Sequence, residues 1–287
     1  MRRTSAERLP RRASHRIVAA VLGPLEPGTT VVLRGDDRRA AGTETVLVVG
    51  IGIGLAAARS VISLAADLTA PGGLPAQSAT LNGSLAPGRP WIDLGFQLVF
   101  IASLLLPALL AVQLAHRSAG GVRALGLRWS TWRRDAALGL GIAATIGGLG
   151  LGCYLLSYAA GFSVTVVPAD LPDVWWRSGV LALSAAANAT LEEVVLVGFL
   201  LHRCRQLGWS DRRAAALSAG LRGSYHLYQG LAGGLGNLVM GYLFARYYQR
   251  NTSIVPLVVA HTAIDLTAFF GYALLAGKVG WLPAMRS

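Results

Sequence analysis

Six ionisable side chains in the C-terminal third of the sequence lie inside stretches of apolar residues. These are Glu192, Glu193, Arg222, His226, His261 and Asp265. An ionisable side chain inside a bilayer costs about 2.5–3.5 kcal/mol even on the most lenient scale. Six of them, lipid-facing and unpaired, would cost on the order of 15 kcal/mol. We therefore expect these side chains to converge on one interior site.

The spacing of four of these residues supports such convergence. His261 and Asp265 are four positions apart and share one face of a helix, so Asp265 can orient His261 or stabilise its charge. Arg222 and His226 have the same spacing. Because the rise is about 1.5 Å per residue, His226 would lie deeper than the others unless residues 210–217 run along the interface. We therefore expect a helix break near Gly220 and Gly223.

The two adjacent glutamates are predicted to differ in role. Neighbouring residues on an α-helix point about 100° apart, so Glu192 and Glu193 should not both face one spot. One is expected to face the site, and the other to pair with a neighbouring helix. Arg222 is the nearest cation for that pair in the helical part of the sequence.

A carboxylate and two imidazoles around a water molecule suit hydrolysis. The carboxylate takes a proton from the water, the water attacks a carbonyl, and the imidazoles stabilise the oxyanion or hold a metal. Glu192, His226 and His261 are also an adequate set of zinc ligands. Each residue has a structural interpretation too, because His and Glu–Arg pairs link membrane helices. The gathering of six such residues in one region favours catalysis.

The elements that hold these residues are expected to be membrane helices. Hydrophobic residues make up 53% of the 287 positions and charged residues 14%, against about 25% charged in a soluble domain. Apolar runs of about 20 residues can cross a bilayer as helices. Seven spans are predicted, at roughly 45–67, 92–114, 136–158, 178–200, 213–230, 231–249 and 253–275. The fold class is therefore all-α, a polytopic transmembrane helix bundle.

The net charge of +12 is explained by membrane topology. Arginines gather in the segments 1–44, 115–135 and 201–213, and the intervening loops are poor in them. Under the positive-inside rule this places the N-terminus in the cytoplasm. Nucleic-acid binding is not expected, because Lys is nearly absent and no nucleic-acid-binding motif accompanies the Arg-rich tail.

Four regions are predicted along the chain. They are an Arg-rich cytoplasmic extension at 1–43, expected to be disordered or to lie on the surface, N-terminal membrane helices and loops at 44–177, a core bearing the ionisable residues at 178–275, and a short tail at 276–287. Cys153 lies in the span 136–158 and Cys204 just after the span 178–200, near opposite faces, so no disulfide is expected between them.

At its ionisable residues the chain resembles the CPBP (CAAX protease and bacteriocin-processing, or Abi) family of intramembrane proteases. The family carries the motifs EExxxR, FxxxH and HxxxN or HxxxD on successive membrane helices. Here Glu192–Val197, Arg222–His226 and His261–Asp265 resemble them in order and placement. The resemblance covers residues 178–275. Val197 stands where the motif has Arg, and Arg222 where it has Phe. Since one cation is lost and one gained, we expect Arg222 to compensate from the neighbouring helix.

The resemblance implies an endopeptidase acting on a membrane-associated peptide near the cytoplasmic face. Glu192 would be the general base that activates water, with Glu193 beside it. His226 would hold the water or stabilise the oxyanion, and His261 with Asp265 would complete the site. The family is often labelled metalloprotease, with Glu192, His226 and His261 as candidate ligands of a metal such as zinc, yet metal-free activation of water is equally open.

The family's substrates include prenylated C-terminal peptides and bacteriocin precursors, so a peptide or lipidated protein is the expected partner, beside membrane lipid. A sequence rich in Ala, Gly and Arg and poor in Lys is typical of a high-GC bacterium, which favours the bacterial plasma membrane and a peptide or signalling-protein substrate. The oligomeric state stays open.

Two alternatives from other classes are kept. One is a degenerate, non-catalytic membrane partner or immunity protein that retains the helices. The other is a proton-coupled transporter with a Glu/His/Asp relay. Many transporters have matching polar segments in both halves, whereas here the ionisable residues lie in the second half, which argues against transport.

Overall fold

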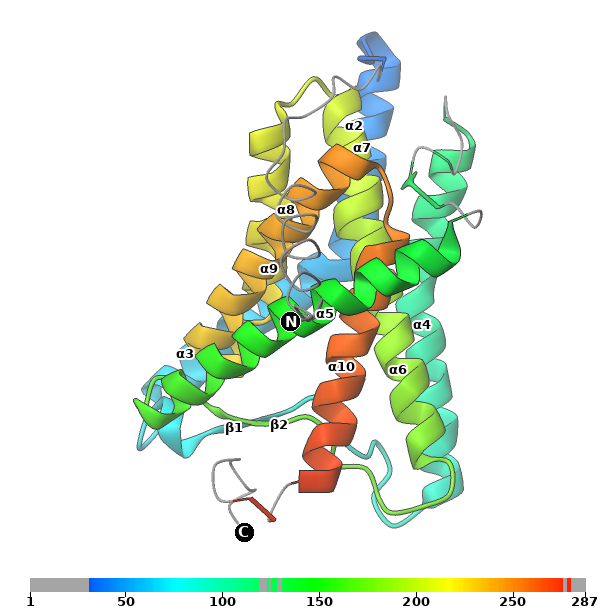
Figure 1. The fold of residues 1–287 in the computed structure, drawn as a ribbon. Coiled ribbons are helices and arrows are strands. Elements are labelled where there is room, and N and C mark those ends of the chain that lie inside the picture. The colour runs from blue at the N-terminus through cyan, green and yellow to red at the C-terminus, as the bar shows by residue number, and fades with distance from the viewer. Residues whose placement is uncertain (1–30, 119–122, 124, 128–130, 276–277, 280–287) are drawn as a thin grey trace, which may run out of the picture.

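The computed structural model describes residues 31–118, 123, 125–127, 131–275 and 278–279. In these residues the chain forms a helical bundle with one small sheet (Figure 1), which confirms the predicted all-α class. The elements are α2 (Gly35–Val49), η1 (Gly50–Gly54), α3 (Leu55–Thr69), η2 (Leu74–Ala76), β1 (Ser78–Thr80), α4 (Pro90–His116), α5 (Trp132–Ala159), β2 (Thr165–Val167), α6 (Arg177–Glu192), η4 (Glu193–Phe199), α7 (Leu200–Gln206), α8 (Asp211–Tyr225), η5 (Leu227–Gln229), α9 (Gly230–Asn251) and α10 (Val255–Leu275).

Five helical stretches in the described part of the chain are long and apolar enough to cross a membrane. They are Gly35–Thr69, Pro90–His116, Trp132–Ala159, Arg177–Gln206 and Val255–Leu275. They correspond to five of the seven predicted spans. The other two, 213–230 and 231–249, correspond to α8 and α9, which do not meet these criteria. With 15 residues, α8 is shorter than the roughly 20 residues that a bilayer crossing needs.

Helix α2 starts earlier than the apolar pattern suggested. It begins at Gly35 and carries Asp36 and Asp37 in its first turn, where acidic side chains favour a helix N-terminus. The predicted extension 1–43 therefore overlaps this helix at residues 35–43. Residues 1–30 of the extension, and most of the predicted tail 276–287, lie outside the described residues.

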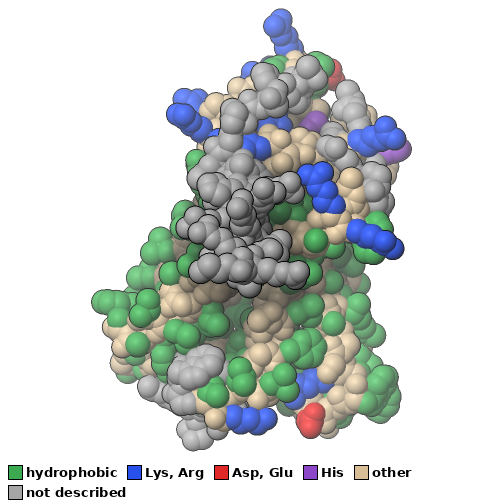
Figure 2. Space-filling model, in the orientation of Figure 1, with side chains coloured by type: hydrophobic (Ala, Val, Ile, Leu, Met, Phe, Trp, Pro, Cys, Tyr) green, Lys and Arg blue, Asp and Glu red, His purple; other side chains and the backbone are tan. Residues whose placement is uncertain are grey.

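The two ends of the bundle differ in character. At one end β1 pairs in parallel with β2, with Ser78 opposite Thr165, so the loop before α4 and the loop before α6 lie on the same side. Figure 2 shows that Lys and Arg side chains gather at the other end, and that hydrophobic side chains cover much of the surface in between. The exposed apolar residues include Leu156 and Val46, which are 73% and 72% exposed. Such a surface fits lipid rather than water.

The helix Arg177–Gln206, made of α6, η4 and α7, is the centre of the bundle. In its most apolar window 72% of the residues are buried, against 11–33% in the other four spans. Its residues Val194–Leu201 are nearly all in the main hydrophobic core, together with Phe244 of α9 and Leu257 of α10. Side chains on this helix are therefore the ones most shielded from lipid and water.

Glycines bring the surrounding helices close together. A Cβ at Gly223 of α8 would lie 2.9 Å from Leu238 Cβ of α9, and one at Gly139 of α5 would lie 2.6 Å from the Pro256 carbonyl oxygen of α10. The expected break at Gly220 and Gly223 is wrong, since α8 runs without interruption to Tyr225. Gly223 serves close packing instead. Helix α8 ends at Tyr225, and α9 begins at Gly230, whose φ is +85°.

Candidate active site

Both adjacent glutamates face the same site, contrary to the prediction that only one would. The segment Glu193–Phe199 is π-helical, directly after the α-helical Glu192. A π-turn holds more residues than an α-turn and changes the angle between neighbouring side chains, and such turns are frequent at functional sites. Glu192 and Glu193 are both fully buried, and each approaches the same guanidinium and the same imidazole.

Glu193 is the centre of the ion cluster. Its Oε1 accepts a hydrogen bond from Arg222 Nη2 at 2.6 Å and lies 2.8 Å from His261 Nδ1. Because a carboxylate only accepts, His261 Nδ1 must carry the hydrogen of this bond. One carboxylate oxygen thus joins three elements, η4, α8 and α10. The predicted partnership of the glutamate pair with Arg222 is observed in this geometry.

Glu192 makes fewer close contacts with charged groups than Glu193 does. Its Oε2 lies 3.7 Å from Arg222 Nη2 and 3.8 Å from His261 Nδ1, beyond hydrogen-bond length. Its Oε1 accepts from Asn188 Nδ2 at 3.2 Å. Oε2 receives no hydrogen bond from the residues that the structure describes. Glu192 therefore keeps one oxygen available to a further group.

Asn188 is a site residue that the sequence analysis missed. It lies one helical turn before Glu192 on α6, which places it on the same face. The signal was present, since an amide side chain in a membrane helix usually hydrogen-bonds to a neighbour. A criterion based on ionisable side chains does not include a neutral amide.

His261 and Asp265 share a helix face, as their spacing predicted. His261 Nε2 lies 3.7 Å from Asp265 Oδ1, which is an ion-pair distance rather than a hydrogen bond. With Nδ1 directed to Glu193, His261 lies between two carboxylates. The Asp265 side chain is 17% exposed, whereas those of Glu192 and Glu193 are at most 1% exposed. Asp265 therefore marks the more accessible edge of the cluster.

His226 lies just beyond the end of α8. Its Nδ1 is 2.9 Å from the carbonyl oxygen of Arg222, and since a carbonyl only accepts, Nδ1 carries the hydrogen. In the neutral imidazole the other nitrogen, Nε2, is then a hydrogen-bond acceptor. His226 interacts electrostatically with Glu192 and His261, and its ring centroid is 4.2 Å from that of Tyr225.

Arg222 is the fully buried cation of the cluster. Its guanidinium lies 5.4 Å from the Phe244 ring centroid on α9, a cation–π contact. Of its nitrogens, Nε and Nη1 have no hydrogen-bond partner among the described residues. Because an uncompensated charge is costly to bury, the cation and the glutamates depend on one another.

The depth of the site differs from the expected one. The predicted span 178–200 ends eight residues after Glu192, which would place Glu192 about 12 Å from the end next to the Arg-rich segment 201–213. The helix instead continues to Gln206, so Glu192 lies near the middle of the stretch Arg177–Gln206. At 1.5 Å per residue this is about 21 Å from either end. The ion cluster thus lies near the midplane of the central helix.

The candidate metal ligands are already engaged with one another. Ligating atoms of Glu192, Glu193 and His261 lie within 4.8 Å of each other; the predicted set had His226 in place of Glu193. The Nδ1 of His261 is 2.8 Å from Glu193, and a metal would need that nitrogen unprotonated. The Arg222 guanidinium already neutralises the same carboxylate. As arranged, these residues do not fit a metal ion.

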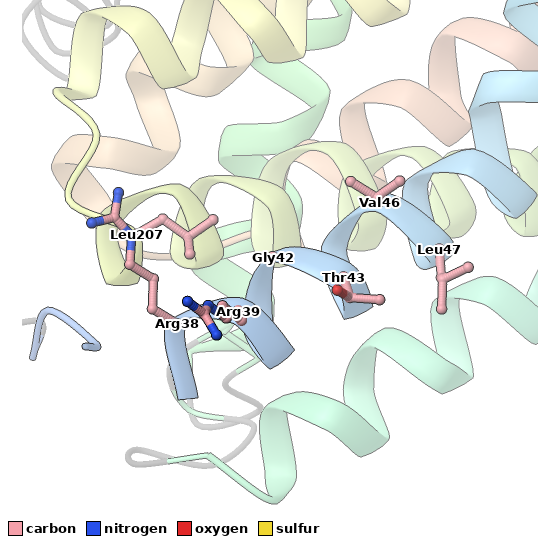
Figure 3. Close-up of a pocket in the computed structure, with 7 residues that line it drawn as sticks. All are labelled: Arg38, Arg39, Gly42, Thr43, Val46, Leu47 and Leu207. Carbon is pink, nitrogen blue, oxygen red and sulfur yellow. The ribbon is translucent and has the colours of Figure 1, made fainter. Parts of the chain in front are cut away.

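A surface groove elsewhere is separate from this cluster. It lies between α2 and the residue after α7 (Figure 3), and none of the predicted site residues lines it. The lining residues are Arg38, Arg39, Gly42, Thr43, Val46, Leu47 and Leu207.

The segment that holds the ion cluster is similar to a known protein family. Residues 174–267 match the family model described as Rce1-like, type II CAAX prenyl endopeptidase. The matched segment contains all six of the ionisable residues singled out above. The match confirms the resemblance to the CPBP intramembrane proteases. Neither a curated protein nor a solved structure matches the chain.

Proposed function

From this Rce1-like core in an integral membrane protein, we propose that the chain is an intramembrane endopeptidase in which Glu192 activates the attacking water. The observation that supports the proposal most is the difference between the two glutamates. Each glutamate has an Oε2 without a hydrogen bond from the described residues, but Glu193 is held through Oε1 by Arg222 and His261, whereas Glu192 is held at hydrogen-bond length only by the neutral amide of Asn188. A general base needs a free oxygen on a carboxylate that no direct ion pair already neutralises.

The neighbours of Glu192 suit this role. Asn188 fixes the carboxylate through its other oxygen. Arg222 and His261 lie 3.7 and 3.8 Å from Oε2, close enough to attract its negative charge without blocking it. His226, with Nδ1 bonded to the Arg222 carbonyl, can accept a hydrogen of the water at Nε2 and so orient it. Asp265 stabilises His261 from the far side.

We propose that the reaction is metal-free. Arg222 provides the positive charge that a metal ion would otherwise supply. The negative charges of Glu192 and Glu193 depend on Arg222 for their balance. This is consistent with the departure from the motif, in which Arg is missing at Val197 and present at Arg222. Removal of divalent ions should then leave cleavage unchanged.

For the substrate we propose a peptide segment of a membrane-associated protein that reaches the site from within the bilayer. The matched family is described as a CAAX prenyl endopeptidase, and a lipid-modified or apolar peptide suits a site about 21 Å from either end of its helix. The low Lys content and the abundance of Ala, Gly and Arg support a bacterial plasma membrane as the location.

A cleavage assay in detergent tests the proposal. Wild-type protein, Glu192→Gln and His261→Ala would be incubated with a farnesylated CAAX peptide, and with a mixture of membrane-derived peptides analysed by mass spectrometry. Each reaction would be run with and without EDTA. We expect cleavage by the wild type alone, unaffected by EDTA. A folded wild type that cleaves nothing would favour the non-catalytic membrane partner, and loss of activity in EDTA would refute the metal-free mechanism.

A further inference from the structure

We propose that Tyr225 is a further catalytic residue, whose hydroxyl donates a hydrogen bond to the carbonyl oxygen of the scissile peptide as negative charge develops on it. The inference rests on the endopeptidase function proposed above. It follows from an account of which donors in the cluster are free to serve an oxyanion and which are already used.

The nitrogen donors of the cluster are poorly placed to serve an oxyanion. His226 donates Nδ1–H to the Arg222 carbonyl, and its Nε2 is an acceptor when the ring is neutral. His261 donates from Nδ1 to Glu193, and its Nε2 lies 3.7 Å from the Asp265 carboxylate, which would repel an oxyanion. Arg222 has Nε and Nη1 without a partner among the described residues, but its side chain is fully buried.

Asp265 cannot fill the gap. An ionised carboxylate has no hydrogen to donate and would repel an oxyanion. At this position the resembled motif carries either Asn or Asp, and only Asn would bring N–H donors. A chain with Asp265 therefore needs a neutral donor from another position.

Tyr225 has the required chemistry and place. Its hydroxyl is buried, and its acceptor among the described residues is the Glu192 carboxylate, at more than ordinary hydrogen-bond length. Its ring packs on His226 at 4.2 Å between centroids. Its side chain is partly exposed, whereas that of Arg222 is fully buried.

The Tyr225 hydroxyl and Glu192 Oε2 suit different parts of the reaction. Without substrate the hydroxyl has only a long hydrogen bond to the Glu192 carboxylate among the described residues, which it can exchange for a closer acceptor. Glu192 Oε2 is an acceptor that suits a water hydrogen, and the Tyr225 hydroxyl is a donor that suits a carbonyl oxygen. A water and a peptide carbonyl together would satisfy both atoms.

The reaction then balances. The water oxygen bonds to the carbonyl carbon while Glu192 Oε2 takes its proton, and the C=O π pair moves to the carbonyl oxygen. Tyr225 donates a hydrogen bond to this oxyanion and keeps its own proton. The C–N bond breaks as the C=O bond re-forms, and Glu192 delivers its proton to the departing amine. The products are a carboxylic acid and an amine.

Tyr225→Phe tests the inference, with Tyr242→Phe as the matched control, because Tyr242 lies on α9 and is 40% exposed. Loss of one oxyanion donor typically lowers kcat by about 10²–10³-fold. We expect a fall of that size in Tyr225→Phe with KM changed less than about threefold, and no change in the control. The affinity for a phosphinate peptide, a tetrahedral transition-state analogue, should fall in parallel with kcat/KM.

Each other outcome overturns the inference. An unchanged kcat would show that the hydroxyl is not used, a rise in KM alone would show that Tyr225 only packs against substrate, and failure of Tyr225→Phe to fold would assign the hydroxyl a structural task. Glu192→Gln in the same assay separates this inference from the proposed function. If Glu192→Gln is inactive and Tyr225→Phe is fully active, the endopeptidase stands and only the role of Tyr225 falls. A folded but inert wild type removes both.

Discussion

Replacement of Arg222 by the Phe of the resembled motif should damage both stability and cleavage. Arg222→Phe removes the cation that lies 2.6 Å from Glu193 Oε1 and 3.7 Å from Glu192 Oε2. Removing one partner of a buried ion pair costs about 3–5 kcal/mol, because the other charge stays buried and uncompensated. In this cluster both glutamates lose their cation, so we expect the free energy of unfolding to fall by an amount in that range.

A second substitution should restore much of what the first removes. Val197 lies four residues beyond Glu193 and five beyond Glu192 within the π-helical segment, in which i→i+5 neighbours stack above one another. Arg at that position would return the cation to the same carboxylates from within the central helix. We expect the double variant Val197→Arg/Arg222→Phe to regain most of the lost stability and cleavage.

The assay pairs chemical unfolding in detergent with cleavage measured per folded molecule. Arg203→Phe is the matched control, because Arg203 is also a buried arginine in a salt bridge, with Glu44 of α2, but does not contact the ion cluster. It should lose stability and keep its activity per folded molecule. If Arg222→Phe alone retains stability and cleavage, or if the double variant recovers neither, the idea that one cation was moved from position 197 to 222 is refuted.

Three further predictions follow from the geometry of the cluster. Glu193→Gln should lower the free energy of unfolding by about 3 kcal/mol and abolish cleavage, since it breaks the bonds to two helices. Glu192→Gln should abolish cleavage with little loss of stability. Equal unfolding curves for the two variants would contradict this difference. Asn188→Ala should lower kcat by about tenfold with KM unchanged, because Glu192 loses the hydrogen bond of 3.2 Å that orients it; unaltered kinetics would exclude a positioning role. Gly223→Ala places a Cβ 2.9 Å from Leu238 and should separate α8 from α9 and reduce cleavage, whereas Gly220→Ala, with nothing within 4 Å, should be silent in both thermal unfolding and activity.

The apolar runs predicted most of the fold because membrane helices are determined by composition over long windows. Five expected spans correspond to helices that can cross a bilayer, and the spacing of His261 and Asp265 correctly predicted a shared face. The prediction for helix α8 was less accurate. Its 15 residues are amphipathic and short, so a rule based on apolar length extended it to residue 230, past the break at Tyr225.

The details of the site depended on features that have no pattern in a single sequence. The π-turn at Glu193 brings both glutamates to one place, and nothing in local propensity distinguishes it from an α-turn. The proximity of Arg222 to the glutamates was predictable because a buried charge needs an opposite one. The role of Asn188 was not recognised, because a neutral amide adds little to the cost of burial and so drew no attention.

The small parallel sheet has a mechanical consequence. Three residues of β1 pair with three of β2, and Tyr154 near the end of α5 accepts a hydrogen bond at 3.0 Å from the Val166 amide on the opposite edge of β2. The polypeptide leaving α3 is thereby fastened, through β2, to α5. Separating the end of α5 from these strands would break this hydrogen bond, so we expect the two segments to move together.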